Sequence, residues 1–314
     1  MRFTVTLTLI LIHTLFLQGQ ENMIIVNGDT VYEQKPSRGD FLLGKGKTKR
    51  VLKAYRREYK KSPKETAYNF ACAFARNNEP DSAFKYLFYN AEYDTSFGFL
   101  CLTDPDFITL RADSRWLKLK DTVLSHFSKW HPGLISNLPL AAKLWDMMAW
   151  DQAYYNEVDI ARNKLGPASP VVAALWNLKM IIGERNQLEL DSIIGIYGWP
   201  KISAVGHYAS NSAFLIVQHS TLEKQEKYLP DIKLLCEQKE CEWQSYALMY
   251  DRIKVGQGLP QLYGSQITYN YVTHKYEFFP IEDEINVNKR RAEVGLNPIE
   301  DYGKIFGIRY VPKK

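Results

Sequence analysis

The chain has 314 residues, of which 46% are hydrophobic, 13% aromatic and 24% charged. This composition is typical of a globular protein and excludes wholesale disorder, and the length allows one large domain or two of ordinary size. The formal net charge of +5 is small for a chain of this length and does not indicate a nucleic-acid partner.

Residues 1–19 predict export. Arg2 gives the segment a positive start, and residues 3–17 form an apolar run that only threonines and His13 interrupt. This pattern is typical of a secretory signal peptide. The run is shorter than the roughly 20 apolar residues that a membrane-spanning helix needs. We therefore expect a periplasmic or secreted mature chain that begins near Gln20 and has no integral membrane segment.

Residues 20–61 are expected to form a hairpin followed by a basic linker or helix. Apolar runs at 23–26 and 29–32 flank Asn27-Gly28, a strong signal for a tight turn between two strands. Lysine and arginine then crowd residues 47–61. Such a run either binds an anionic surface or forms the solvated face of a helix.

Residues 62–131 predict a pair of packed helices. Ser62-Pro63 marks a helix start, residues 77–80 break that helix, and Asp81 caps a second one. Small and bulky residues alternate along the pair in a spacing that resembles a tetratricopeptide repeat, namely Ala71, Phe74, Ala83 and Leu87. The phrase that starts at Asp104-Pro-Asp-Phe107 resembles the end of such domains in exported bacterial proteins. The resemblance implies a surface for a protein or peptide partner, although a single repeat is equally consistent with a structural cap.

Residues 132–314 are expected to form an α-rich domain with a small β-hairpin, so the whole chain is predicted to be mainly α. Helical patterns cover residues 140–165, 171–182 and 187–197, and Pro230 is expected to begin a further segment. The hairpin is predicted from residues 261–271, which alternate in polarity, and from residues 276–279, which can return antiparallel to them.

The chain has four cysteines, and an exported protein can oxidise them. Cys72 lies in a helical apolar pattern and is expected to be a small core residue. Cys236 and Cys241 flank a predicted turn between two helices, and the sequence leaves open whether they form a disulfide.

Several short phrases between residues 140 and 302 resemble a bacterial family catalogued only as a domain of unknown function. They are LWDM with DQ, then GWP, FLIVQHS, KYLP, YDR, GLPQLYGSQ and NKRRAEVGL, in this order. The chain departs from the usual phrases at Tyr155, Ser265 and Asn288, where the family often has Arg, Thr and Asp. The resemblance implies a shared fold and family membership, and it implies no particular activity.

The polar residues of these phrases are the candidate site, and they are Gln218, His219, Asp251, Arg252, Tyr263 and Gln266. Arg252 lies among apolar neighbours on its predicted helix, so an acid, a carbonyl or a ligand anion should face it. We expect the cluster to line one cavity in which Arg252 holds an anionic or carbonyl group and the glutamines orient it.

Two functions follow from this cluster. The first is an exported protein that binds a ligand or a protein partner. The second is a hydrolase or transferase in which His219 is the general base, Asp251 orients it and Arg252 holds an anionic substrate group. His219 could instead be satisfied structurally by a carbonyl. No residues have the spacing of metal ligands, and the sequence indicates neither the ligand nor a cofactor.

Overall fold

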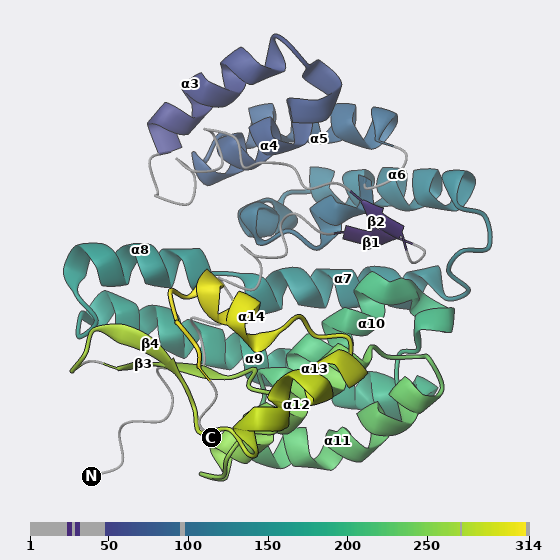
Figure 1. Cartoon of the computed structure of the whole chain (residues 1–314). Helices are drawn as coiled ribbons and strands as arrows, with labels where there is room; N and C mark the ends of the chain where they lie inside the picture. The colour runs from purple at the N-terminus through teal and green to yellow at the C-terminus, as the bar shows by residue number, and fades with distance from the viewer. Residues whose placement is uncertain (1–23, 27–28, 32–47, 95–97, 271, 312–314) are drawn as a thin grey trace. The chain divides into compact units, whose positions relative to one another are not determined.

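The computed structural model describes residues 24–26, 29–31, 48–94, 98–270 and 272–311, and the predicted signal peptide lies outside them. The described part is mainly α-helical, with two small antiparallel sheets of two strands each, as the sequence predicts (Figure 1). None of the helices in these ranges is both long enough and apolar enough to cross a membrane.

The chain divides into two compact units. The first runs from Pro36 to Ile216, and the second contains Val217–Lys314 together with the residues up to Lys35. The domain boundary predicted near residue 132 lies within the first unit. That unit therefore contains both the predicted helical pair and the beginning of the predicted α-rich domain.

The first unit is helical throughout its described residues. Its elements are α3 (Thr48–Tyr59), α4 (Pro63–Arg76), α5 (Pro80–Tyr93), the 3-10 helices η1 (Gly98–Leu102) and η2 (Pro105–Ala112), α6 (Arg115–Trp130), α7 (Leu138–Gln152), α8 (Tyr155–Leu165), α9 (Pro170–Tyr197) and α10 (Ile202–Gln218), which ends just past the boundary. Prolines at the first turns of α4, α5, α7 and α9 mark these starts, because proline needs no backbone donor there.

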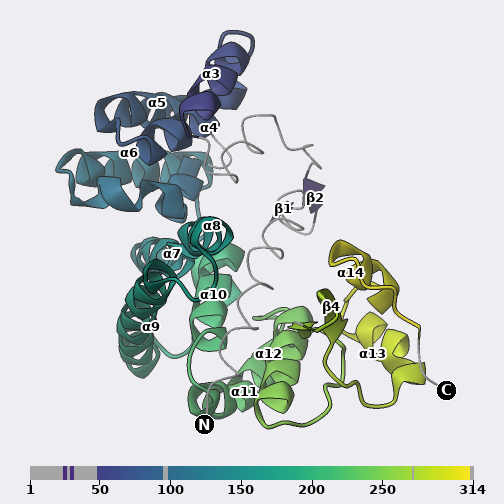
Figure 2. The same ribbon diagram turned by 90° about the vertical axis from the view of Figure 1, so that its left-hand side faces the viewer.

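Small residues let the predicted helical pair pack closely. Ala71 of α4 and Ala83 of α5 are completely buried, and the two helices lie against each other (Figure 2). Phe70 and Tyr86 add an aromatic contact across the pair, with ring centroids 4.7 Å apart. The helical pair is therefore present where the sequence predicts it.

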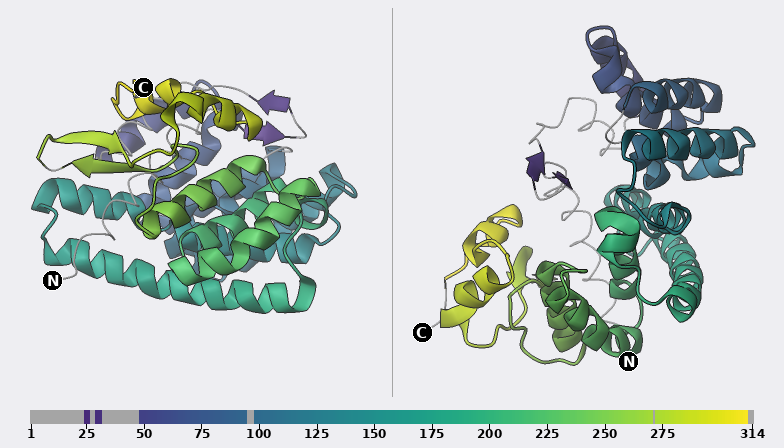
Figure 3. Two further views of the ribbon diagram at one scale, coloured as in Figure 1. Left: turned by 60° about the horizontal axis from the view of Figure 1, so that its bottom comes forward. Right: turned by 90° about the vertical axis from the view of Figure 1, so that its right-hand side faces the viewer.

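Two helical predictions in the first unit are wrong in their boundaries. Residues 140–165 do not form one helix, because Tyr154 takes a left-handed conformation with φ of 70° and separates α7 from α8. Residues 171–197 do not form two helices but one of 28 residues, α9, which packs against both α7 and α8 (Figure 3). The break at Tyr154 has no glycine or proline signal, whereas α9 continues through Gly183, a residue that disfavours a helix interior.

The second unit combines short helices with both small sheets. Its helical elements are α11 (Leu222–Glu237), α12 (Trp243–Gly256), η3 (Glu284–Asn286), α13 (Val287–Glu293) and α14 (Ile299–Ile305), and its strands are β1 (Ile24–Val26), β2 (Asp29–Val31), β3 (Ile267–Asn270) and β4 (Lys275–Phe278). β1 pairs with β2 and β3 with β4, both antiparallel. The pair β3–β4 forms the narrow ribbon visible in Figure 3.

Pro230 lies inside α11 and does not begin a segment, contrary to the sequence prediction. A proline within a helix removes one backbone hydrogen bond and usually bends or ends the helix. Here Tyr228 and Ile232, on either side of the proline, are both buried. Tertiary packing of this apolar face stabilises the helix across Pro230, since packing contributes more to helix stability than local propensity.

Candidate functional site

The centre of the candidate site is the irregular segment of residues 261–266 between α12 and β3, called the site loop below. The sequence predicts a strand here, but β3 begins only at Ile267. The Gln261 side chain closes the loop: its Nε2 donates to Gln266 O (2.9 Å) and its Oε1 accepts from Gln266 N (2.8 Å). Gly264 has φ of +65°, a backbone conformation that favours glycine.

Asp251 of α12 anchors the site loop. Its carboxylate accepts hydrogen bonds from the main-chain N–H groups of Leu262 (2.7 Å), Tyr263 (3.0 Å) and Ser265 (2.9 Å). Burial raises the pKa of Asp251 above its ordinary value, and these amide hydrogen bonds partly offset that effect. Both carboxylate oxygens are directed at the loop, so Asp251 holds the main chain of the site.

Arg291 of α13 and Tyr302 of α14 hold the site loop through its carbonyl groups. Arg291 Nη1 donates to Tyr263 O (2.7 Å) and lies 3.3 Å from Gly264 O. The Tyr302 hydroxyl donates to Ser265 O (2.9 Å). Sequence reasoning assigned neither side chain to the site. The RR phrase was a visible signal for Arg291, whereas nothing in the sequence linked Tyr302 to the loop.

Arg252 donates a hydrogen bond to a carbonyl, one of the three kinds of partner expected from the sequence. It is 7% exposed, and its Nη1 donates to the main-chain oxygen of Gln218 (2.6 Å). Gln225 Nε2 donates to the same oxygen (2.9 Å) and to Ser220 O (3.0 Å). Arg252 and Gln225 thus stabilise the junction between α10 and α11, and a carbonyl is one of the partners expected for Arg252.

Gln266 is buried beside α12 with one of its polar atoms unsatisfied. The residue is 1% exposed, and its Nε2 donates to Ser265 Oγ (3.0 Å) and lies 3.5 Å from Leu248 O. Leu248 is one helical turn before Arg252. Gln266 Oε1 has no hydrogen-bond partner in the described part of the chain. A buried carboxamide oxygen of this kind requires an explanation, because nearly all such groups are paired.

His219 and Tyr263 are the more accessible of the predicted site residues. Both are half-buried, and His219 follows Gln218 at the end of α10. Tyr263 packs edge-on against Tyr250 with ring centroids 6.1 Å apart, and burial raises its pKa to about 12. The structure thus brings Gln218, Arg252, Tyr263 and Gln266 around α12 and the site loop.

The DQ phrase at the end of α7 forms a separate polar group in the first unit. Gln152 Nε2 donates to Asp151 Oδ2 (2.6 Å), and Lys179 Nζ donates to the main-chain oxygens of Asp151 and Ala153 (2.8 Å each). Burial lowers the pKa of Lys179 to about 8. Its Nζ lies 3.3 Å from the ring centroid of Tyr155. Sequence reasoning missed Lys179, although a lone lysine in an apolar helical run was a usable signal.

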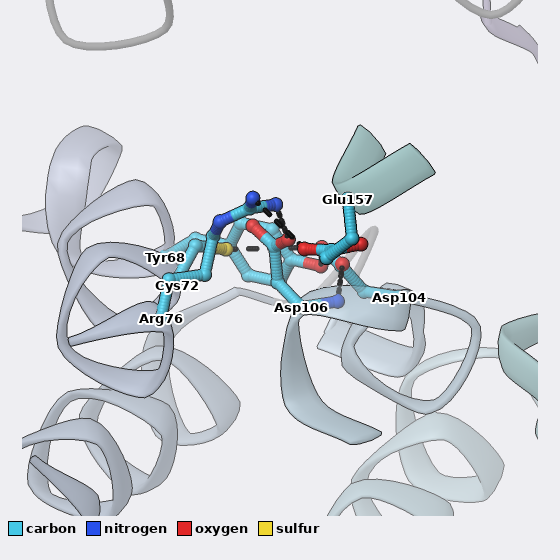
Figure 4. Close-up of polar contacts among 6 residues, drawn as sticks. All are labelled: Tyr68, Cys72, Arg76, Asp104, Asp106 and Glu157. Atoms are coloured by element: carbon cyan, nitrogen blue, oxygen red, sulfur yellow. Dashed lines mark hydrogen bonds and ion pairs between the residues drawn. The ribbon is translucent and has the colours of Figure 1, made fainter. Parts of the chain in front are cut away.

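A second polar cluster connects α4, η2 and α8, again within the first unit (Figure 4). Asp104 Oδ1 accepts from Asp106 N (2.8 Å) and its Oδ2 from the Tyr68 hydroxyl (2.6 Å). Arg76 donates to Asp106 Oδ1 (2.7 Å) and to Glu157 Oε1 (3.1 Å). Burial and the nearby Asp104 raise the pKa of Asp106 to about 7, although Arg76 acts in the opposite direction. The cluster fixes η2 against α4.

No group of three or more His, Cys, Asp or Glu side chains in the described ranges is arranged to hold a metal ion. All four cysteines carry free thiols, and all four are buried.

Comparison with known proteins gives one match. Neither the curated proteins nor the solved structures contain a match to this chain. A model of DUF6624, a family of unknown function, matches residues 139–313. This segment covers more than half of the 314 residues and includes all six predicted site residues. The chain therefore belongs to the family of unknown function DUF6624.

Proposed function

We propose that this is an exported protein that binds a small ligand in its C-terminal domain, beside Gln266 and Arg252. The observation that carries the proposal is the buried Gln266 Oε1, which has no hydrogen-bond partner in the described residues. A buried acceptor without a partner costs about 1–3 kcal/mol. A ligand that offers an N–H or O–H group to this oxygen would remove that cost.

The surroundings of Gln266 suit such a ligand. Asp251, Arg291 and Tyr302 fix the main chain on both sides of the site loop, so Gln266 is presented by a rigid element. The buried guanidinium of Arg252 adds a positive charge one helical turn from Leu248, which Gln266 contacts. We infer a ligand that carries a hydrogen-bond donor toward Gln266 and a carbonyl or anionic group toward Arg252.

The alternative, a hydrolase or transferase with His219 as general base, receives less support from this geometry. A general base needs a partner that orients it, and Asp251 was the predicted one. Asp251 instead directs both oxygens at main-chain amides of the site loop. The main-chain amides thus already engage both oxygens of Asp251, and this favours ligand binding over proton transfer.

Export rests on the charge and apolar pattern of residues 1–19. N-terminal sequencing of the protein from fractionated cells tests it. We expect a mature chain that begins near Gln20 outside the cytoplasm, and a cytoplasmic protein that retains Met1 would contradict export.

A thermal-shift screen of small amides, acids and sugars on the full mature chain tests the binding function. A ligand at about 100 times its Kd stabilises the folded state by about 2.7 kcal/mol, which is readily measured. We expect Gln266→Met to abolish the shift, and the control Gln257→Met, at the exposed end of α12, to leave it unchanged. A compound that stabilises the wild type and the Gln266→Met variant equally would place the binding site elsewhere.

A further inference from the structure

A groove with a basic lining runs along α3, outside the segment that the family model matches. Its volume is about 660 Å³, within the range of about 300–1,000 Å³ that is usual for ligand sites. The described residues that line it are Leu52, Lys53, Arg56, Arg57, Lys60, Asn77 and Glu79. These residues come from α3, from Lys60 directly after it, and from the turn between α4 and α5.

The sequence of α3 places its cations on one face. Val51 and Tyr55 are buried where α3 packs against α4. The other face carries the exposed cations Lys53, Arg56 and Arg57, and the exposed Lys60 in the turn directly after α3 continues their spacing of i, i+3, i+4 and i+7. Residues three and four positions apart are neighbours on a helix surface, so these cations form one contiguous strip.

This strip is electrostatically unfavourable on its own. Like-charge pairs at these spacings destabilise a helix. The helix dipole favours cations in the last turn of α3 but does not relieve the repulsion between them. In the described residues no acidic side chain forms an ion pair with any of the four, and Glu79 is the one acid among the described lining residues. An anionic partner would relieve this repulsion.

We propose that the groove on α3 binds an acidic segment of a partner protein. Carboxylate side chains match the forked guanidinium groups of Arg56 and Arg57, which form paired hydrogen bonds with carboxylates. Leu52 gives the groove an apolar patch for the aliphatic parts of the same segment. A concave groove fits an extended chain, whereas a flat lipid surface would contact only its rim. The site is separate from Gln266, which belongs to the other compact unit.

The test is fluorescence anisotropy with the full mature chain and a labelled peptide rich in glutamate. The matched probe is the same peptide with glutamine in place of glutamate. We expect the glutamate peptide to bind and the glutamine peptide to bind at least about tenfold more weakly, because the glutamine peptide cannot form several charge-assisted hydrogen bonds with the strip at once. Binding should weaken as salt is raised, since ions screen exposed charges.

Two variants locate the site. The double substitution Arg56→Gln with Arg57→Gln keeps good helix formers and should lower the affinity for the glutamate peptide at least about tenfold. The control, Lys118→Gln with Lys129→Gln, removes two exposed charges from α6 of the same unit and should change nothing. Circular dichroism checks that both variants remain helical.

Three outcomes would overturn the inference. The first is equal binding of the glutamate and glutamine peptides, a comparison that needs no variant. The second is an equal loss of binding in the α6 control, which would mean a response to net charge alone. The third is tighter binding of anionic lipid vesicles or of an oligonucleotide that depends on the same two arginines, which would replace a protein partner by a different class.

Discussion

Replacing Arg76 by methionine should destabilise the first unit in a way that depends on pH. Arg76 is the cation that faces Asp106 and Glu157 in the cluster of Figure 4. The Asp106 side chain is 15% exposed and that of Glu157 is 43% exposed, so the contact with Asp106 dominates. Methionine preserves much of the side-chain volume and removes only the charge and its hydrogen bonds.

The magnitude follows from the burial of the pair. Two unit charges about 4 Å apart interact by about 4 kcal/mol at an effective dielectric constant of about 20. Removing one partner of a buried pair typically costs about 3–5 kcal/mol, because the other charge stays buried. Asp106 can escape part of this cost by taking up a proton. We therefore expect about 3 kcal/mol at alkaline pH and about 1 kcal/mol at acidic pH.

The sign of the pH dependence comes from Asp106. Its pKa of about 7 in the folded chain lies above the ordinary value of 3.8, so the folded chain binds this proton more tightly than the unfolded chain. The stability that Asp106 contributes is therefore greatest below about pH 4 and falls as the pH rises to about 7. Loss of Arg76 raises the pKa of Asp106 further, which extends this decline above pH 7.

Urea denaturation of the wild type and of Arg76→Met, at about pH 5.5 and about pH 8.5, measures the effect. The matched control is Arg115→Met, because Arg115 forms exposed ion pairs with Asp81 and Asp113 and should contribute little at either pH. The reasoning is refuted if Arg76→Met loses the same stability at both pH values, or no more than the control loses.

Three further predictions concern the second unit. Gly264→Ala should lower the free energy of unfolding by more than about 2 kcal/mol, because φ is +65° and a Cβ would lie 2.4 Å from Ile299 Cδ1; urea denaturation measures this loss. Asp251→Asn should lower the free energy of unfolding by about 2–4 kcal/mol, because an asparagine keeps only one of the two oxygens that accept from the loop amides and points an NH₂ group at the others. Amide hydrogen exchange should then show that the site loop opens before the rest of the chain. Cys236 and Cys241 are buried and their thiols donate to the main-chain oxygen of Glu242 (3.4 and 3.8 Å), so a maleimide should label neither thiol in the folded chain and both after denaturation; rapid labelling of either thiol before denaturation would contradict this.

Much of the helical fold could be predicted because apolar spacing and terminal prolines are local signals. Ser62-Pro63 and Ser169-Pro170 both stand at helix starts. Predictions failed where packing decided the outcome. Pro230 is tolerated inside α11 because its neighbours are buried, and residues 171–197 continue as one helix. These effects depend on contacts that no local pattern contains.

The candidate site could be predicted in part. The position of Arg252 in an apolar stripe correctly required a partner, and a carbonyl supplies it. The role of Asp251 could not be predicted, because its partners are main-chain amides of the site loop, which every sequence contains. The direction in which these amides point depends on the turn at Gly264. Arg291, 27 residues further along the chain, donates to the carbonyl of that turn.

The three anchors of the site loop also determine when the site can form during synthesis. Asp251 precedes the loop, but Arg291 follows it by 27 or 28 residues and Tyr302 follows its acceptor by 37. Contacts of this separation must close long stretches of chain before they contribute stability, so they form late in folding. A chain interrupted before Tyr302 would contain the whole loop but lack its last anchor. The site loop is therefore fully anchored only after Tyr302 has been synthesised.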